Sequence, residues 1–278
     1  MQESFEINSA SGSYEIVVGS GLLNDIVQAH PDAIFLVDER LKGCLPVDRG
    51  LKIILLQAVE NNKSLEAMPE VILKMREAGA NRGTHLVAIG GGIIQDIATF
   101  VASIYMRGLA WTYMPTTFLG MVDSCIGGKS SVNVHNYKNL VGNFHPPKSV
   151  HIDLDFLKTL SAEMVVGGLY EAAKICYARS YEKFGEYLAE QPQYPLSSEQ
   201  AHNIILHSLK TKKWFIEIDE FDQKERLLLN YGHTFGHAIE AGTNFGISHG
   251  IAVGIGMVVA VEYAKANGQL TAAGQQSA

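Results

Sequence analysis

The stretch His85-Leu-Val-Ala-Ile-Gly-Gly-Gly-Ile-Ile-Gln-Asp96 decides the fold of this chain. Its apolar, β-branched first half is typical of a buried strand, and three glycines then lead into a helical pattern. Glycines at such a turn let the backbone approach a pyrophosphate, whose charge is stabilised by the helix N-terminus. A tight strand-to-helix turn without a ligand explains the same residues, because the spacing is not G-x-G-x-x-G.

Similar runs surround this stretch. Residues 14–18, 33–38 and 51–56 are short and β-branched, and helical patterns separate them, such as 64–78 with a cap-like Ser64. Alternating strands and helices predict a mostly parallel sheet covered by helices. Beyond about residue 155 the strand-like runs stop, and helical patterns cover residues 161–190, 198–218, 224–242 and 250–267. We therefore predict an α/β N-terminal nucleotide-binding domain over residues 1–155 and an all-α C-terminal domain over 156–278, with the site in the cleft between them.

Composition limits the class of protein. The 278 residues are 47% hydrophobic and 18% charged, which is typical of a soluble globular protein. A net charge of −7 without a run of lysines and arginines argues against nucleic acid as a partner. Three cysteines without a CxxC pair indicate neither a disulfide framework nor a cysteine zinc site. The N-terminus is unlike a signal peptide, and the apolar run 251–260 is too short to span a bilayer, so we expect a cytoplasmic protein without a membrane partner.

A second informative stretch is Asn230-Tyr-Gly-His-Thr-Phe-Gly-His-Ala-Ile-Glu240, which His249 follows. In a helix, spacings of three, four and three place its Asn, both His and its Glu on one face. Imidazole is the commonest zinc ligand, and zinc sites often add a carboxylate from elsewhere in the chain. Spacing alone would make His233 and His237 the ligands, although unrelated histidines that cap helices explain the same pattern.

Basic and polar side chains gather around paired glycines in residues 105–142. Such a loop cradles phosphate or carboxylate, because donors and positive charge converge where the backbone can come close; a solvated loop is the alternative. The segment Gly127-Gly-Lys-Ser130 is similar to a Walker loop but lacks the earlier glycine, which argues against an NTPase. Asp38, at the end of a predicted strand, fits either a ribose contact or a helix cap.

Taken together, these motifs resemble the 3-dehydroquinate synthases, within the sugar-phosphate cyclases. The resemblance covers nearly the whole chain and rests on Gly90-Gly-Gly-Ile-Ile-x-Asp96, Tyr105-Met-Arg-Gly108, Pro115-Thr-Thr117, Val122-Asp-Ser-x-Ile-Gly-Gly-Lys129, Lys138-Asn-Leu-Val-Gly142, Gly168-x-x-Glu171-x-x-Lys174, Asp219-Glu220 and Arg226-x-x-x-Asn230-x-x-His233-x-x-x-His237. It implies a dehydroquinate synthase-like fold, a site that holds both NAD and zinc or cobalt, and a homodimer.

The resemblance also implies a role for each matching residue. The metal ligands would be Glu171, His233 and His249, so that His237 becomes a catalytic residue together with Lys174 and Asp222. The substrate pocket would be formed by Arg107, which is expected to reach across the dimer interface, and by Lys129, Asn139, Lys212, Arg226 and Asn230. The NAD contacts would be Asp38, Glu60, Lys63, Gly91, Gly92, Asp96, Thr116, Thr117, Asp123, Lys138 and Thr159.

The implied reaction converts 3-deoxy-D-arabino-heptulosonate 7-phosphate to 3-dehydroquinate and phosphate. It proceeds by transient oxidation with NAD, elimination of phosphate, re-reduction and an intramolecular aldol closure. This small, anionic sugar-acid phosphate explains why an acidic protein gathers lysines and arginines in one pocket. Several features depart from the family: Gln95 stands where glycine is common, Ser130-Ser131 where Thr-Gly is usual, Gly167 where a polar NAD contact is expected and Asp222 where a glutamate base is usual. The family also continues through further helices with a late phosphate-binding lysine. We therefore expect a helical domain that is short at its C-terminus.

Three alternatives remain open from the sequence. An inosose-type or valiolone-type cyclase would keep NAD and zinc but would have no substrate carboxylate for Arg226 and Lys212 to bind. A metal-dependent polyol dehydrogenase of the same fold usually presents an aspartate and several histidines and lacks the anion pocket. A non-catalytic scaffold that binds NAD is the third.

Overall fold

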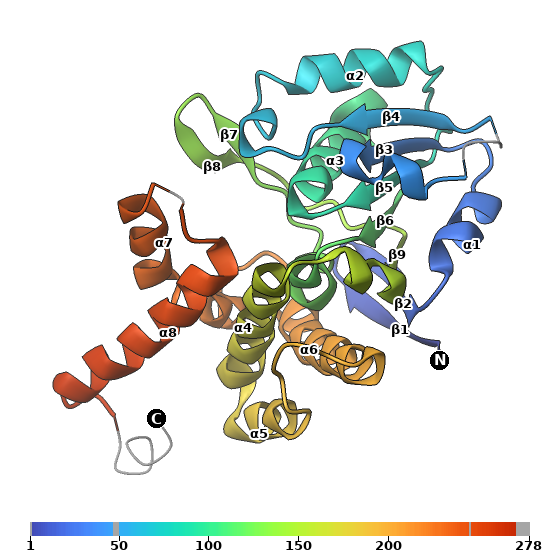
Figure 1. Cartoon of the computed structure of the whole chain (residues 1–278). Coiled ribbons are helices and arrows are strands. Elements are labelled where there is room, and N and C mark those ends of the chain that lie inside the picture. Colours follow the sequence, from blue (N-terminus) through green and yellow to red (C-terminus); the bar gives the residue numbers. More distant parts are fainter. Residues whose placement is uncertain (1, 47–49, 245, 271–278) are drawn as a thin grey trace.

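The computed structural model describes residues 2–46, 50–244 and 246–270. Its first half is built on a seven-stranded sheet in the order β1-β2-β9-β6-β5-β3-β4 (Figure 1). The strands are β1 (Glu3–Ser9), β2 (Gly12–Gly19), β3 (Ile34–Asp38), β4 (Lys52–Leu56), β5 (Leu86–Gly90), β6 (Trp111–Pro115) and β9 (Ser149–Asp153). Among these strands, β1 and β2 pair antiparallel and all other neighbours pair parallel. The predicted α/β fold class is therefore confirmed.

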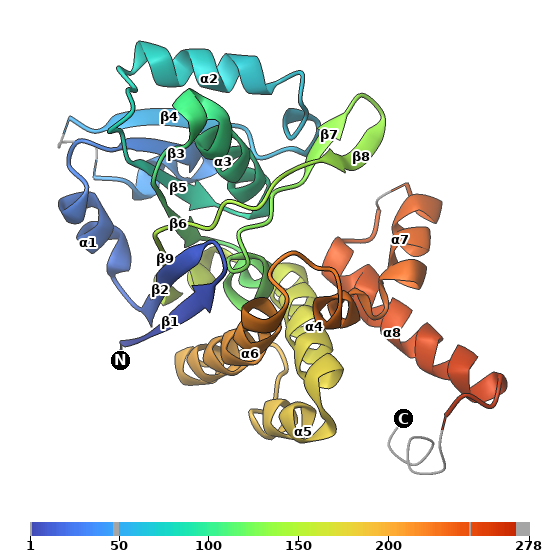
Figure 2. The ribbon, with the colours of Figure 1, turned by 180° about the vertical axis from the view of Figure 1, so that it is seen from behind.

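The central strands are continuous apolar runs because both faces of the sheet are covered. Every residue of β3, β5 and β6 is buried. Helix α3 (Gly92–Ile104) packs against β3, β5 and β6, as Figure 2 shows, while α1 (Leu22–Ala29) contacts β9 and α2 (Met68–Glu77) contacts α3. The carboxyl ends of β5 and β6 therefore meet at one edge of the sheet, where ligands of open α/β folds bind.

The four strands predicted from the sequence are confirmed, whereas the start of the first long helix is not. Helix α2 begins at Met68 with a proline in its first turn, and Ser64 instead forms a β-bridge with Asn133. Proline favours the first turn of a helix because its missing N–H has no intrahelical partner there. The cap-like pattern at Ser64 was therefore a wrong prediction.

The second half is helical, as predicted. It contains α4 (Ala162–Arg179), α5 (Tyr181–Ala189), α6 (Ser198–Ile218), α7 (His233–Gly242) and α8 (His249–Ala266), with short helices η6 (Leu154–Thr159) and η7 (Glu225–Asn230). The predicted helix over 161–190 is divided at Ser180, whose hydroxyl accepts a hydrogen bond of 3.2 Å from the Lys183 N–H and so caps α5. The proposed boundary after residue 155 falls within η6, and its exact position stays a prediction.

The predicted helix over 224–242 is also two elements, η7 and α7. Gly232 separates them with a φ of 78°, a backbone conformation that a side chain disfavours, and a Cβ there would meet Met257 of α8. Asn230 therefore does not lie on the helical face that carries His233, His237 and Glu240. The prediction of one continuous face was wrong at this residue.

Contacts between the halves fix the site. Helix α6 packs on β1 and β2, and the π-helical turn η5 (Gly120–Ser124) inserts against α4 and α6. A hairpin formed by β7 (Val132–Val134) and β8 (Tyr137–Val141) projects from the first half on the side of α7 (Figures 1 and 2). Of these elements, α4, α6, α7 and η5 contribute residues to the lining of the cavity at the carboxyl edge of the sheet.

Helix α8 is longer than the apolar run from which the sequence prediction was made. It has 18 residues with a mean hydropathy of 1.2 and is 28% buried, so by length and composition alone it could cross a membrane. This is weak evidence of a membrane segment, since helices of soluble proteins pass the same test. Here α8 packs against α4 and α7, and its first residue, His249, faces the site described next.

Candidate active site between the sheet and the helices

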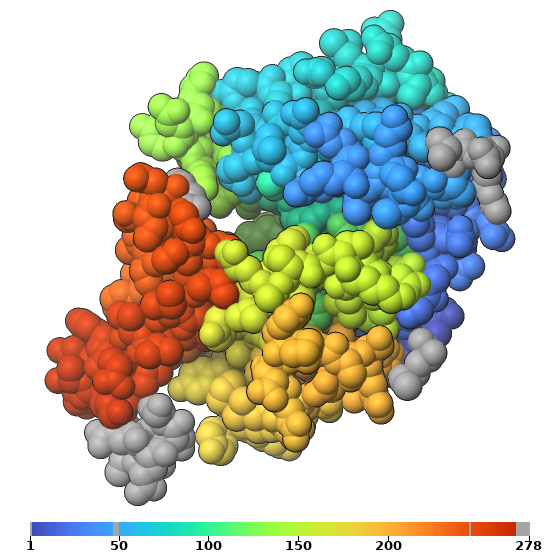
Figure 3. All heavy atoms as spheres, viewed as in Figure 1, coloured from blue at the N-terminus to red at the C-terminus, as the bar shows by residue number. Residues whose placement is uncertain are grey.

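A cavity of about 260 Å³ lies at the carboxyl edge of the sheet, between the two halves. Figure 3 shows the surface hollowed between helices α7 and α8, in orange-red and red, and the rest of the molecule. The lining comes from both halves: Gly92, Gln95, Asp96, Asp123, Ser124, Ile126, Lys129 and Ser131 from the first, and Lys174, Lys212, Asp222, Arg226, Leu229, Asn230 and His233 from the second. The structure thus gathers cofactor, substrate and metal candidates around one space.

The triple glycine forms the predicted turn from β5 into α3. A Cβ on Gly91 would lie 2.8 Å from Cγ2 of Thr117, so this glycine is required by close packing against the end of β6. Thr116 continues that contact, because its N–H donates to the Gly90 carbonyl at 3.0 Å. A Cβ on Gly92 would meet nothing within 4 Å. The backbone at Gly92 is therefore open to a ligand at a helix N-terminus, which fits the pyrophosphate of NAD.

A polar network adjoins this turn. The ammonium of Lys63 lies 3.1 Å from the Asp96 carboxylate and 3.0 Å from the side-chain oxygen of Asn139. Glu60 lies 3.7 Å from the same ammonium and accepts a hydrogen bond of 2.9 Å from Asn133. Burial raises the pKa of Asp96 to about 6, although Lys63 opposes this shift. Asn139 was predicted from the resemblance to bind substrate, but it lies among the residues predicted to bind NAD.

Asp38, Arg107, Lys138 and Thr159 are among the predicted residues that are absent from the cavity lining. Asp38 forms an ion pair of 2.5 Å with Arg40 and caps the short helix η1 (Glu39–Cys44), so the helix-cap interpretation is confirmed. Arg107 is exposed at a φ of 73°, Lys138 is exposed in β8, and Thr159 is exposed with its hydroxyl donating to the Phe156 carbonyl. Contacts of these four residues with NAD or substrate stay predictions.

Three buried charges meet beside the cavity. The turn η5 carries Asp123 between α4 and α6, where its carboxylate pairs with Lys174 at 3.3 Å and with Lys212. Burial alone would raise the pKa of Asp123, but Lys174 and Lys212 outweigh it and hold this pKa far below its usual value. Burial would lower the pKa of Lys174, but Asp123 and Glu171 raise it. For Lys212, burial prevails and the pKa is lowered.

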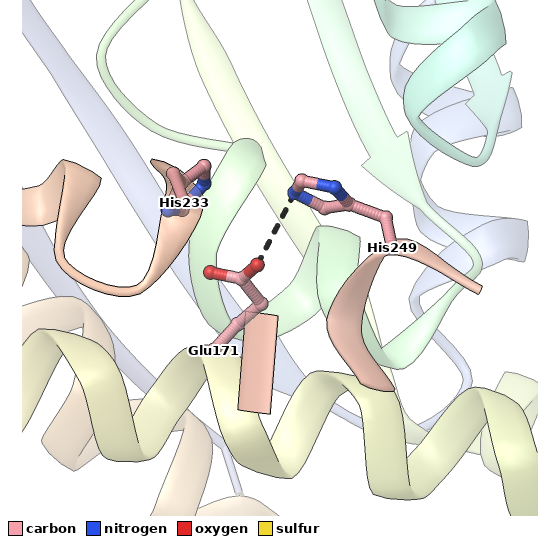
Figure 4. A group of neighbouring side chains, drawn as sticks. All are labelled: Glu171, His233 and His249. Atoms are coloured by element: carbon pink, nitrogen blue, oxygen red, sulfur yellow. Dashed lines mark ion pairs between the residues drawn. The ribbon is translucent and has the colours of Figure 1, made fainter. Parts of the chain in front are cut away.

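The three residues implied as metal ligands come together. Glu171, His233 and His249 each offer an atom within 4.8 Å of the others, and Figure 4 shows the Glu171 carboxylate beside both imidazoles. Oxygen Oε1 of Glu171 is buried without a hydrogen-bond partner, and burial raises the pKa of this carboxyl. Burial, Lys174 and His249 lower the pKa of His233 to about 4, so its imidazole is neutral near pH 7. A buried carboxylate oxygen without a hydrogen-bond partner thus lies beside two imidazoles. This set of donor atoms fits a zinc-like cation.

The histidine pair suggested by spacing is not the pair that lies beside the buried carboxylate of Glu171. The ring of His237 lies 5.2 Å from that of His233, but its side chain is exposed. It belongs to a second group, with Glu240 and His249, whose ligand atoms also lie within 4.8 Å of one another.

Four cations from both halves line the cavity: Lys129, Lys174, Lys212 and Arg226. Lys129, which follows Gly127 and Gly128, forms an ion pair of 2.5 Å with Asp222 and so connects this loop to the helical half. Arg226 is buried, and its guanidinium donates to the Glu220 carbonyl. Positive charge concentrated in this way attracts a small anion to a protein whose net charge is −7.

The sequence analysis missed several lining residues. Gln95 donates to the Ser124 carbonyl at 2.6 Å and accepts from the Ser124 hydroxyl at 2.8 Å, while the Ser131 N–H donates to Asp96 at 2.8 Å. All three lie within one or two residues of Asp96, Asp123 or Lys129. Their adjacency to the motifs was the signal that could have found them.

Comparisons with known proteins agree with this geometry. The pattern described as 3-dehydroquinate synthase N-terminal matches residues 53–166, and the corresponding C-terminal pattern matches residues 168–278. A protein named 3-dehydroquinate synthase from Saccharolobus solfataricus is 41% identical over 257 residues, which are 90% of this chain and 72% of that protein. The chain belongs to the 3-dehydroquinate synthase family. Its relatives of that name indicate an enzyme of the lyase type, and the family implied by the sequence motifs is confirmed.

Solved structures of related cyclases are similar throughout the fold. A 2-deoxy-scyllo-inosose synthase in complex with carbaglucose-6-phosphate, NAD+ and Co2+ is 28% identical with a TM-score of 0.85, covering 95% of this chain and 77% of that one. A 2-epi-5-epi-valiolone synthase from Streptomyces hygroscopicus with NAD+ and Zn2+ bound is also 28% identical, with a TM-score of 0.80 and coverage of 94% and 77%. The dehydroquinate synthase-like fold is therefore confirmed.

Proposed function

We propose that this chain is a 3-dehydroquinate synthase that uses NAD and zinc or cobalt to convert 3-deoxy-D-arabino-heptulosonate 7-phosphate to 3-dehydroquinate and phosphate. The observation that carries the proposal is one cavity lined by four cations and bordered by an open glycine turn, together with the Glu171, His233 and His249 group, of which His233 lines the cavity. Membership of the family and relatives of that name support the same substrate. We further propose a cytoplasmic homodimer, in which Arg107 contacts the substrate of the partner subunit.

When bound, NAD would accept and return a hydride while the metal polarises a substrate oxygen. Glu171, His233 and His249 would hold the metal, and the open backbone at Gly92 would receive the NAD pyrophosphate. Lys129, Lys212, Arg226 and Asn230 would bind the phosphate and carboxylate of the substrate. These donors convert a flexible sugar acid into one oriented ligand, which lowers the entropic cost of the reaction.

Proton transfers would fall to Lys174 and Asp222 in the cavity lining and to His237 beside it. Lys174 is held by Asp123 and Glu171, and Asp222 is held by Lys129, so each already has a fixed partner. A substrate phosphate that binds Lys129 would release Asp222 from this ion pair. His237 is exposed next to His233 and is placed to exchange protons with solvent.

The alternatives differ in the anion that they must bind. A polyol dehydrogenase has no phosphate to bind, so four cations in one cavity count against it. A sister cyclase of the inosose or valiolone type would bind phosphate but no carboxylate. The buried guanidinium of Arg226, which is suited to bidentate pairing, favours the carboxylate-bearing substrate.

The test is direct. Purified protein loaded with zinc is incubated with the heptulosonate phosphate and a substoichiometric amount of NAD, and phosphate release is followed. We expect many phosphates per NAD, because the cofactor is regenerated in each cycle. Release that stops after one turnover would contradict the cyclase reaction, and no release from this substrate, with release from a neutral sugar phosphate, would favour a sister cyclase.

The open space at Gly92 yields a prediction about the cofactor. Gly92→Val adds a side chain where a Cβ meets nothing within 4 Å, so the fold should survive while the pyrophosphate is excluded. We expect NAD affinity to fall at least about tenfold, roughly the cost of losing one charge-assisted hydrogen bond. Calorimetric titration with NAD, with the thermal midpoint as the folding control, decides the matter. Unchanged affinity would mean that the glycines serve only the turn.

Arg226 yields a prediction about substrate charge. Arg226→Ala removes a buried guanidinium from the cavity, and we expect the binding of a carboxylate-bearing substrate to weaken by about 2–5 kcal/mol. A neutral sugar phosphate should lose far less. Dissociation constants for both ligands, measured on the same variant, separate substrate recognition from a loss of folding. Equal weakening would show that Arg226 only supports the Glu220 loop.

A further inference from the structure

Each of the three candidate metal ligands has one polar atom held by a neighbour and another directed at the shared space. Glu171 receives Lys174 on Oε2, while Oε1 has no hydrogen-bond partner. His233 has Nδ1 placed 3.3 Å from the Tyr231 carbonyl. His249 has Nδ1 placed 3.1 Å from Oε2 of Glu240, and Nε2 lies 3.4 Å from Oε1 of Glu171.

A carboxylate can only accept a hydrogen bond, so the contact with Glu240 places the proton of His249 on Nδ1. The lone pair of Nε2 is then directed toward Glu171 Oε1, the atom that lacks a partner. His249 is the first residue of α8 and its side chain is 38% exposed, so few packing contacts fix its ring. Glu240 is 14% exposed and lies two helical turns beyond His233 on α7, a rigid position from which to orient that ring.

We propose that Glu240 is a positioning residue of the metal site, which accepts the Nδ1 proton of His249 and fixes Nε2 as the metal-binding atom. The proposal rests on the proposed function, because it presupposes a metal held by Glu171, His233 and His249. Carboxylates that accept from the far nitrogen of a ligand histidine fix its orientation and raise its basicity. Glu240 would thereby act on affinity without touching the ion.

The second group of possible ligands, His237, Glu240 and His249, supplies the competing interpretation, in which Glu240 binds an ion directly. The structure favours positioning for two reasons. Glu240 Oε2 already has a hydrogen bond of 3.1 Å with the imidazole of His249, whereas Glu171 Oε1 is buried without any hydrogen bond. His237, the third member of the second group, is exposed.

The experiment compares Glu240→Gln and Glu240→Ala with the unmodified protein. Each is stripped of metal, and its zinc dissociation constant is measured by competition with a chromophoric chelator; cobalt absorption reports the ligand field. We expect affinity about 10–100-fold weaker in Glu240→Ala, a smaller loss in Glu240→Gln, whose amide oxygen can still accept from Nδ1, and a shifted cobalt spectrum in both. Glu262→Gln is the matched control, since Glu262 lies exposed on α8 with Lys265 as its partner and should change neither readout.

The outcomes distinguish a wrong role for Glu240 from a wrong assignment of the metal site. Variants with the affinity and cobalt spectrum of the unmodified protein would overturn the role of Glu240 and leave the metal site intact. Loss of metal from Glu240→Ala and His237→Ala, with retention in His233→Ala, would overturn it in favour of direct ligation in the second group. Absence of zinc binding by the unmodified protein would overturn the metal assignment of the proposed function, and this inference with it.

Discussion

His233→Ala is expected to lose the bound zinc and to abolish turnover, whereas His237→Ala should retain one zinc per chain. His233 lies beside the buried, unpaired oxygen of Glu171, while His237 is exposed outside that group. Removal of a ligand should weaken zinc binding by more than the roughly 10–100-fold that follows from losing an outer-shell contact.

Metal content after dialysis against a weak chelator measures the difference between the two variants. His237→Ala should still lose activity if this residue transfers a proton, so metal content and turnover must be read separately. Equal loss of zinc from both variants would indicate that His233 and His237 are the metal ligands, as their spacing alone suggests. Circular dichroism of each variant checks that the helices are intact.

Helical spacing could not identify the metal ligands, and the reason is physical. Periodicity describes one element at a time, whereas Glu171, His233 and His249 come from α4, α7 and α8. The left-handed turn at Gly232 also removes Asn230 from the helix that the spacing assumed. Only the order of many short motifs, through resemblance to a family, placed the three ligands together.

The architecture could be predicted from the sequence more fully than the metal ligands, because it depends on local patterns. The apolar runs of β3 and β5 and the glycine turn at Gly91 and Gly92 predicted a parallel sheet with a site at its carboxyl edge. In the seven-stranded sheet, β1, β6 and β9 were missed, because their alternating or mixed patterns become strands only through pairing with neighbouring strands. Tertiary contact supplies the information that a single segment lacks.

The charge network around Asp123 was beyond sequence reasoning for a similar reason. Resemblance implied a contact with NAD at this residue, and the motif gave no sign of the two lysines. The turn η5 brings Asp123 against Lys174 of α4 and Lys212 of α6, which lie far along the chain. Because the three charges lie together away from water, each ionised group depends on the others to offset its cost of desolvation.

Asp123→Asn should therefore destabilise the protein strongly even without ligands. The substitution keeps the shape of the side chain but leaves Lys212 without its carboxylate partner and Lys174 with Glu171 alone. Breaking a buried ion pair by removing one partner costs about 3–5 kcal/mol. Asp155→Asn is the control, because Asp155 is 50% exposed in its ion pair of 2.6 Å with Lys158, and exposed pairs contribute about 0–1 kcal/mol.

Urea unfolding of both variants and the unmodified protein, in the absence of NAD and metal, measures this difference, and its pH dependence supplies a second check. The pKa of Asp123 is lowered in the folded protein, so its contribution is present above its unfolded value of 3.8 and is lost as pH falls below that value. The gap between Asp123→Asn and the unmodified protein should thus be constant from neutral pH to about pH 5 and should narrow in stronger acid. If Asp123→Asn unfolded at the same urea concentration as Asp155→Asn, Lys212 would have to be neutral in the folded protein, and its assignment as a cationic substrate ligand would fall with that result.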